Sequence, residues 1–265
     1  MTFVENLLLV FVAGLITALA TGIGALPFFL VSDISKRWTV YLWGFASGIM
    51  VSASVFGLII EAEAFKSPFL ATVGILAGVL IVEVADRILE DREIDPKDYE
   101  DAEFKRLILI LGVLTVHSFP EGVAVGVSFA ELGLEGQGIE FLGFAIPILA
   151  VYMTIAISVH NIPEGISISI PLRSLGVSEY RMVGWSIFSS LPQPIGAVIA
   201  FGFVTVARDL LPIGYGFAAG AMVYLVATEF IPEAREEAEG LDDSSTPIFV
   251  GIISGILVMT PLLAI

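Results

Sequence analysis

The sequence predicts an all-α membrane protein with eight transmembrane helices. Its 265 residues are 57% hydrophobic, and the mean hydropathy is +0.94. Apolar runs of roughly 20 residues, the length that crosses a hydrocarbon core of about 30 Å, recur from one end of the chain to the other. These properties lie outside the range of ordinary globular domains.

The apolar runs give the expected helices in chain order, near residues 5–31, 39–62, 68–89, 106–130, 140–170, 182–206, 212–231 and 247–264. None of the runs alternates with period two, and Gly and Pro occur throughout, which excludes a transmembrane β-barrel. The first run is too long for a signal peptide and opens with Glu5, so we expect it to remain in the mature protein. We therefore expect one polytopic domain over residues 1–265, in the cell membrane.

The formal net charge of −16 is concentrated in two connecting stretches. One is the loop 90–104 between the third and fourth runs, and the other is 233–243 between the seventh and eighth. Both stretches could be solvated loops, or they could collect or release cations near a pore. The sequence has no cysteine, so a metal site would need imidazole, carboxylate, amide, hydroxyl or thioether ligands.

The basic residues predict the orientation, because short cytoplasmic loops carry an excess of Lys and Arg. When the eight helices are threaded alternately with the N-terminus outside, only Lys66 and Arg208 fall outside. The inner loops then hold Lys36, Arg37, Arg87, Arg92, Lys97, Lys105, Arg106, Arg173, Arg181 and Arg235. The pattern predicts that both termini lie outside and that the acidic loop is cytoplasmic.

Both histidines of the chain lie in a repeated motif. "TVHSFPEGVAVG" begins at Thr115 and "SVHNIPEGISIS" at Ser158. Each His is four residues before a Glu, on the same helix face, and the two helices run in opposite directions. At matching depth, His117 would meet Glu164 and His160 would meet Glu121, near the middle of the bilayer.

The energetics of burial favour a metal site over a purely structural motif. An ionised residue at the centre of a membrane helix costs about 2.5–3.5 kcal/mol, whereas binding of a structural zinc ion yields about 10–16 kcal/mol. Pro120 and Pro163 cannot donate to the carbonyl groups four residues earlier, which leaves those carbonyls free. The alternative is that the prolines are kinks, the histidines are satisfied core residues and the glutamates are protonated packing partners.

"HSFPEG" and "HNIPEG" in the fourth and fifth of eight helices resemble the signature of the ZIP (Zrt- and Irt-like) divalent-metal transporters. The resemblance extends to "GFASGIMVSASVFGLI", "ADRILED", "SSLPQPIGAVIAF" and "FAAGAMVYLVATEFIPEA". It implies a 3+2+3 inverted-repeat fold and a primary metal site of His117, Glu121, His160 and Glu164, with Met50 as the fifth ligand. It also implies a neighbouring position, which here would use the neutral Ser118, Asn161 and Gln193.

Single residues in this set have ordinary alternatives. A methionine in an apolar helix is commonly core filler, and Gln193 could hydrogen-bond to backbone kinked by the flanking prolines. Asn161 and Gln193 supply dipoles where more carboxylate-rich members of the family carry charge, which weakens the second position. Glu229 lies just inside the polar boundary of the seventh helix, and we expect it to line the path by which metal leaves.

The expected function is transport of divalent cations toward the cytoplasm. The resemblance favours zinc, while the ligand types also suit iron, manganese, cobalt and cadmium. The metal would be the transported substrate, with no prosthetic group, and the partners would be metal ions and the lipid bilayer, with a homodimer left open and no nucleic acid. An intramembrane zinc hydrolase is the alternative, although the H-E-x-x-H pattern is missing and catalysis does not require a duplicated motif. A metal-sensing scaffold is a further alternative.

Overall fold

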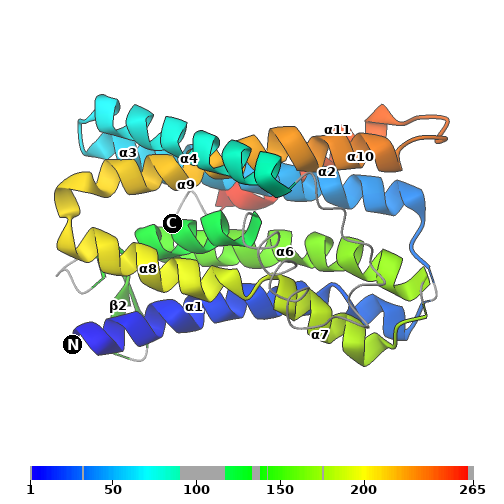
Figure 1. Ribbon diagram of the computed structural model, residues 1–265, viewed down its shortest axis with the longest axis horizontal. Coiled ribbons are helices and arrows are strands. Elements are labelled where there is room, and N and C mark those ends of the chain that lie inside the picture. Colours follow the sequence, from blue (N-terminus) through cyan, green and yellow to red (C-terminus); the bar gives the residue numbers. More distant parts are fainter. Residues whose placement is uncertain are drawn as a thin grey trace.

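The computed structural model describes residues 2–31, 33–89, 117–132, 138–141, 143–174 and 176–261. The predicted acidic loop 90–104 and the first part of the fourth predicted helix lie outside these residues. The described part is a bundle of helices that run nearly parallel to one long axis (Figure 1).

The first half of the chain contributes α1 (Phe3–Ile23), a 3-10 turn η1 (Leu26–Phe29), α2 (Lys36–Ser52), α3 (Ile60–Ala64) and α4 (Pro68–Leu89). Between α2 and α3 the chain continues as a π-helix, η2 (Ala53–Ile59). Residues 117–128 are helical. The second half contributes α6 (Ile148–Ser174), α7 (Glu179–Ser189), α8 (Pro192–Val206), η4 (Arg208–Leu210), α9 (Leu211–Leu225), the π-helix η5 (Val226–Phe230), α10 (Ile231–Glu237) and α11 (Ser245–Met259).

Five helical stretches in the described part of the chain are long and apolar enough to cross a membrane, namely Phe3–Phe29, Lys36–Ala64, Pro68–Ile88, Glu179–Val206 and Arg208–Glu237. The helix Ser245–Met259 is apolar but shorter. α6 is not among the five, and it carries His160, Asn161 and Glu164 in its middle. Polar residues at that depth in an otherwise apolar helix indicate a site rather than a lipid contact.

The prediction of a helix from residue 140 is wrong for its first turns. Residues 139–146 form a short antiparallel hairpin of β1 (Ile139–Phe141) and β2 (Phe144–Ile146), in which Ile139 is opposite Ile146. Gly143 has φ +82° in the connection, a conformation that glycine adopts without steric cost. The helix begins only after Pro147, at Ile148.

The predicted helix 182–206 is present as one membrane-length stretch, which is interrupted at Ser190 and Leu191 and so divided into α7 and α8. Pro192 and Pro194 lie in the first turn of α8, where proline is accommodated because the N–H groups of a first turn have no partner within the helix. The break brings Gln193 to the N-terminal end of α8, deep inside the bundle.

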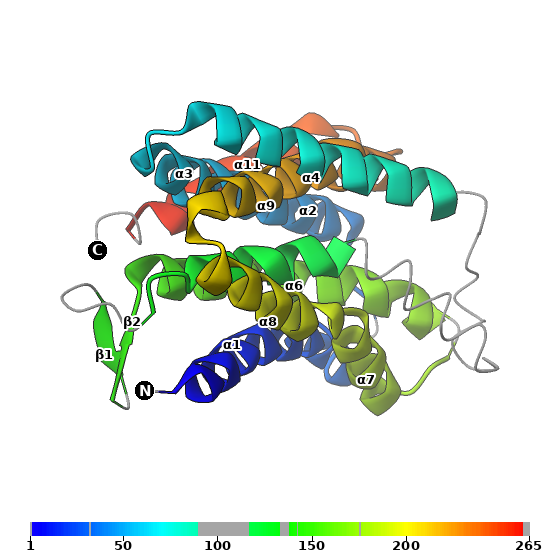
Figure 2. The same ribbon diagram turned by 60° about the vertical axis from the view of Figure 1, so that its left-hand side comes forward.

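The helices form two groups, visible in Figures 1 and 2. One group contains α1, the 117–128 helix, α6, α7 and α8, and the other contains α2, α3, α4, α9, α10 and α11. In the second group, α2 packs against α11 and α4 packs against α9. Glycines allow both contacts to be close, because a Cβ built on Gly48 would lie 2.2 Å from Ile252 O, and one on Gly220 would lie 2.3 Å from Ile75 O.

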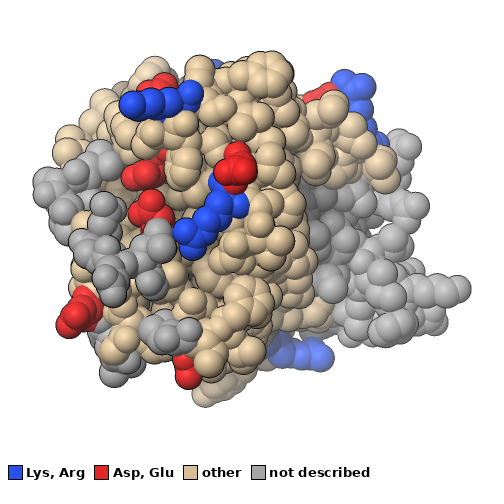
Figure 3. Space-filling view, turned by 90° about the vertical axis from the view of Figure 1, so that its left-hand side faces the viewer, with Lys and Arg blue, Asp and Glu red and all other residues tan. Residues whose placement is uncertain are grey.

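The membrane-length stretches run alternately in opposite directions along the long axis, and α2 with α3, α7 with α8 and α9 with α10 each continue in one direction (Figure 1). The N-terminus, the α3–α4 turn, the hairpin and the α8–α9 turn lie at one end, on the left in Figure 1. The described basic residues are unequally divided, with Lys66 and Arg208 at this end and Lys36, Arg37, Arg87, Arg173, Arg181 and Arg235 at the ends of helices that meet at the other. Figure 3 looks onto the first end, where a few charged side chains of both signs are scattered over a surface of mostly uncharged residues.

The connection from α10 to α11 lies outside the candidate membrane spans. Asp243 accepts a hydrogen bond from the backbone N–H of Thr246, 3.1 Å away. Hydrogen bonds from the Thr246 side chain and backbone hold the pKa of Asp243 below its usual value. Asp243 thereby stabilises the first turn of α11 with negative charge at a helix N-terminus.

Candidate metal centre

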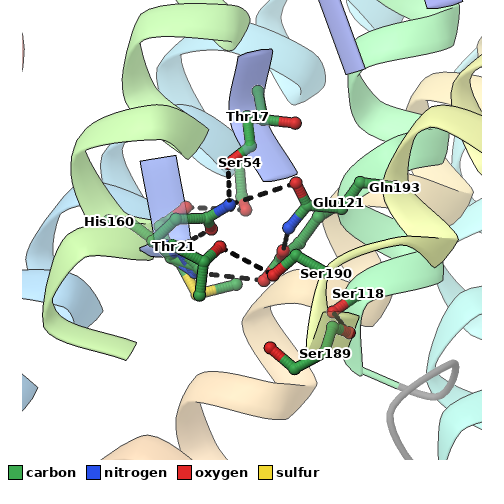
Figure 4. A network of polar contacts seen from close by, with 11 residues as sticks. Thr17, Thr21, Ser54, Ser118, Glu121, His160, Ser189, Ser190 and Gln193 are labelled. Atoms are coloured by element: carbon green, nitrogen blue, oxygen red, sulfur yellow. Dashed lines mark hydrogen bonds and ion pairs between the residues drawn. The ribbon is translucent and has the colours of Figure 1, made fainter. Parts of the chain in front are cut away.

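The 117–128 helix and α6 bring three metal-ligating side chains together. Glu121, His160 and Glu164 each offer one ligand atom, and these atoms all lie within 4.8 Å of one another. Nε2 of His160 is 3.0 Å from Oε1 of Glu121, and both side chains are almost completely buried. The predicted meeting of His160 and Glu121 is therefore present (Figure 4).

The glycine after each glutamate explains how the two motif helices reach this position. A Cβ on Gly165 would lie 1.8 Å from Thr21 O of α1, and a Cβ on Gly122 would lie 2.2 Å from Gln193 O of α8. Any larger residue would separate the backbones. The motif sequence thus sets α6 directly against α1, and the 117–128 helix directly against α8.

The prolines of the motif do not end their helices. Pro163 lies inside α6, and Pro120 lies within the helical residues 117–128. A proline inside a helix removes one hydrogen bond from the preceding turn. For Pro163 the carbonyl left without its helical donor is that of Val159, directly before His160, which is consistent with the predicted irregular backbone beside the site.

Asn161 and Gln193, expected at a second metal position, form a hydrogen-bonded chain that ends at Glu121. Nδ2 of Asn161 donates to Thr17 O at 2.7 Å and to Gln193 Oε1 at 3.0 Å. Nε2 of Gln193 donates to Glu121 Oε2 at 2.6 Å. Oδ1 of Asn161 lies 3.0 Å from His160 Nδ1. The four polar atoms of these two buried amides are therefore all engaged in hydrogen bonds.

Two ligand atoms of the cluster are buried and have no hydrogen-bond partner in the described part of the chain. They are Oε2 of Glu164 and Nε2 of His160; the latter lies 3.0 Å from Oε1 of Glu121, as an ion-pair contact without the geometry of a hydrogen bond. Buried polar atoms of this kind are rare, and each one requires a physical explanation. A divalent cation fits the arrangement, because imidazole nitrogen and carboxylate oxygen are ligands that zinc and similar metals accept, and a cation would neutralise the two carboxylates.

His117 lies in a second cluster, with Asp86 of α4 and Glu229 of η5. Nε2 of His117 is 3.0 Å from Oε1 of Glu229, and no ion pair among the described residues joins His117 to Glu164. His117 therefore forms its ion pair with Glu229 of the other helical group, while His117 and Glu164 line the same cavity. Asp86 lies near the end of the third predicted helix, and the motif spacing gave no signal for this cluster.

One cavity of about 490 Å³ connects the two clusters. Its walls include His117, Glu121, Glu164 and Glu229, and it extends past Ser167 to Glu233 and Glu237 in α10. These last residues lie toward the end of the bundle that carries most of the described basic residues. The cavity therefore links the buried centre to that end, with carboxylates set among largely apolar walls.

Met50 and Ser118 complete the predicted set. Met50 is buried on α2, and its carbonyl accepts a hydrogen bond of 2.8 Å from Ser54, one turn later in the π-helix η2. Ser118 is buried and donates to the backbone carbonyl of Ser189 at 3.1 Å. This bond links the 117–128 helix to the last residue of α7, which is a structural contact (Figure 4).

The chain is similar to known zinc transporters. The family model described as ZIP zinc transporter matches residues 143–263. A putative zinc transporter of Arabidopsis thaliana is 41% identical over 222 residues, which are 83% of this chain and 34% of the plant protein. The chain thus spans about a third of that relative's length.

Two bacterial relatives match over most of their length. The zinc transporter GufA of Myxococcus xanthus is 32% identical over 248 residues, covering 87% of this chain and 92% of the relative. The zinc transporter ZIPB of Bordetella bronchiseptica is 31% identical over 258 residues, covering 91% and 75% respectively. The similarity therefore extends over most of the chain.

Proposed function

Since the chain belongs to the ZIP family of metal transporters and is a multi-pass integral membrane protein, we propose that it carries divalent metal ions, zinc above all, across the membrane into the cytoplasm. One observation supports the proposal most strongly: two carboxylates and an imidazole converge in a membrane bundle, and two of their ligand atoms have no hydrogen-bond partner. The metal is the transported substrate. Iron, manganese, cobalt and cadmium are alternative substrates, since they accept the same ligands.

The proposed transport site consists of His117, Glu121, His160 and Glu164, with Met50 as a further ligand. His160, Glu121 and Glu164 hold the ion in the arrangement described above. His117 lines the same cavity, where rotation of its imidazole away from Glu229 would add a fourth ligand. Glu229 and Asp86 then take part in the passage of the ion from the centre into the cavity.

The direction of transport is supported by the cavity and the charges. The cavity leads from the centre toward Glu233 and Glu237, at the end with most of the described basic residues. Cytoplasmic loops are enriched in Lys and Arg, so this end is proposed to be cytoplasmic, which leaves both termini outside. Carboxylates along the exit attract the cation and exchange it quickly, because oxygen ligands in a solvated setting bind it weakly.

A 3+2+3 inverted repeat is proposed for the bundle. Supporting it, the contact of α2 with α11 is matched by that of α4 with α9, with pairs of glycines in both. The π-helices η2 and η5 occur at corresponding places in the second and seventh predicted helices. A site at the centre of such a repeat can be opened to either side by moving one group of helices against the other.

The alternative of an intramembrane hydrolase has no observation in its favour. The family to which the chain belongs is one of transporters rather than enzymes. Hydrolysis would also need a water position beside the metal and a separate general base, and both carboxylates of the buried centre are already assigned to the cation.

The proposed function is tested by metal uptake into proteoliposomes that contain the purified protein. Zinc, cadmium, cobalt, iron(II), manganese and magnesium are offered in separate experiments, with metal-sensitive and pH-sensitive dyes inside. We expect uptake of zinc and of some softer divalent ions, but not of magnesium, which prefers oxygen ligands and keeps its waters. Absence of uptake of every ion by vesicles that contain folded protein would contradict the proposal.

A further inference from the structure

The buried amides beside the centre form a hydrogen-bond chain whose direction can be deduced. It starts at Thr17 O, a backbone carbonyl that can only accept. Asn161 must therefore direct its amide nitrogen toward Thr17, 2.7 Å away, and the second proton of that nitrogen points to Gln193 Oε1 at 3.0 Å. Gln193 is then left with its own amide nitrogen facing Glu121 Oε2 at 2.6 Å.

The same deduction determines the protonation of the His160 ring. Both protons of Asn161 Nδ2 are in use, so the atom of Asn161 that faces His160 is an acceptor, Oδ1, at 3.0 Å from Nδ1. The Nδ1 atom must carry the ring proton, which leaves a lone pair on Nε2 when the ring is neutral. A flipped Asn161 is excluded because its oxygen would face the oxygens of Thr17 and Gln193.

We propose that the Thr17 carbonyl, Asn161 and Gln193 form an amide clamp that presets the metal centre before the ion arrives. The clamp holds His160 in the tautomer that offers Nε2 as a ligand, and it holds Glu121 with Oε1 free and facing that nitrogen. Asn161 and Gln193 are positioning residues in this account rather than ligands of a second ion. The proposal deepens the proposed function and depends on it only for the identity of the cation.

Burial makes the clamp effective. Thr17, Asn161 and Gln193 have no exposed surface, and His160 is 1% exposed. No solvent competes for these hydrogen bonds, and in a buried setting a broken one costs the full desolvation of its groups. Partners that orient the first ligands of a metal typically contribute 10–100-fold to its affinity.

The clamp is confined to one half of the centre. In the repeated motif, Ser118 occupies the position of Asn161, and its hydroxyl donates to Ser189 O rather than to a histidine. His117 pairs with Glu229 on another helix. The two histidines of the motif therefore differ: His160 is held as a preset ligand, and His117 is held by a carboxylate of the exit path.

The first test uses the fact that the chain has only two histidines. Protein labelled with nitrogen-15 in its histidine rings is measured by NMR in detergent without metal, and the His117→Gln variant assigns the signals. We expect His160 to show a protonated Nδ1 and an unprotonated Nε2. A protonated Nε2 with a bare Nδ1 on the neutral His160 ring of the unmodified protein would overturn the proposal.

The second test compares cadmium-113 binding by the unmodified protein and by the Asn161→Leu and Gln193→Met variants, which keep side-chain volume and remove the amides. We expect the affinity of the single centre to fall about 10–100-fold with unchanged stoichiometry, and the Asn161→Leu variant to lose the single His160 tautomer. The matched control is Ser169→Ala, which removes a fully buried hydroxyl from the same helix; its partners are Gly165 O and Ser186.

Two outcomes would contradict the clamp. Unchanged affinity and tautomer in both variants would mean that the amides position nothing, and loss of one bound ion out of two would make them ligands of a second ion. Failure of the proposed function is distinguishable, because it would appear as absent zinc uptake while the nitrogen signals of the metal-free protein remain as expected.

Discussion

Replacement of Glu121 by Gln should stabilise the metal-free protein and weaken its binding of zinc. The amide has nearly the same shape as the carboxylate. In the unmodified protein, Gln193 Nε2 donates to Glu121 Oε2 at 2.6 Å, and the amide oxygen of the variant can accept the same hydrogen bond. His160 Nε2 lies 3.0 Å from Glu121 Oε1 in the unmodified protein, and the amide nitrogen of the variant can donate to it. The Glu121→Gln variant thus satisfies a buried nitrogen that has no hydrogen-bond partner in the described structure.

The expected change in the free energy of unfolding follows from the burial of Glu121. An ionised side chain at the centre of a membrane helix costs about 2.5–3.5 kcal/mol, so the free energy of unfolding of the metal-free variant should rise by up to that amount. Loss of a residue that only orients a metal ligand lowers affinity by at most about 100-fold. The Glu121→Gln variant loses one of the two carboxylate ligands themselves, so we expect its affinity for zinc to fall by more than this factor.

The assay is thermal unfolding in detergent with a chelator and then with excess zinc. Zinc at 100 times its Kd should stabilise the unmodified protein by about 2.7 kcal/mol, and it should leave the Glu121→Gln variant unchanged. Glu140→Gln is the control, since it removes a carboxylate that is exposed on β1. A variant that unfolds at a lower temperature without metal, and is still stabilised by zinc, would refute the reasoning.

Three further predictions use other parts of the bundle. Gly165→Ala would place a Cβ 1.8 Å from a backbone oxygen of α1 and should destabilise the protein by about 1–3 kcal/mol in chemical unfolding, whereas Gly202→Ala, with nothing within 4 Å, should not. Zinc affinity measured by titration should decrease as the pH is lowered, because protons compete for imidazole and carboxylate ligands; an affinity that rises in acid would contradict the site. Since the chain has no cysteine, Arg208→Cys should react with an impermeant thiol reagent only from outside oriented vesicles and Glu239→Cys only from inside, and the reverse would contradict the orientation.

The helical bundle could be predicted because apolar length is a strong signal. The helices near 68–89 and 247–264 correspond to α4 (Pro68–Leu89) and α11 (Ser245–Met259). The places where a helix is replaced by a hairpin or changes to a π-helix were harder to predict. The hairpin at 139–146 is as apolar as a helix, so hydropathy could not separate the two, and only Gly143 and Pro147 gave a signal. The π-helices η2 and η5 leave no mark in composition.

The site could be predicted in part, because the motif spacing fixes which residues share a helix face. The approach of His160 and Glu121 followed from two antiparallel helices at matching depth. The pairing of His117 with Glu229, and the place of Asp86 beside them, depended on how α4 and η5 pack against the 117–128 helix. Helix spacing contains no information on such contacts, which come from tertiary packing.

The most direct test of the central claim is zinc flux through a variant that lacks half of the centre. His160→Ala combined with Glu164→Ala is reconstituted into vesicles at the same density as the unmodified protein, with folding checked by thermal unfolding. We predict that zinc uptake falls to the level of empty vesicles, because two of the three ligands that converge on the buried centre are gone. Uptake at the rate of the unmodified protein would show that zinc crosses elsewhere, and would contradict the account.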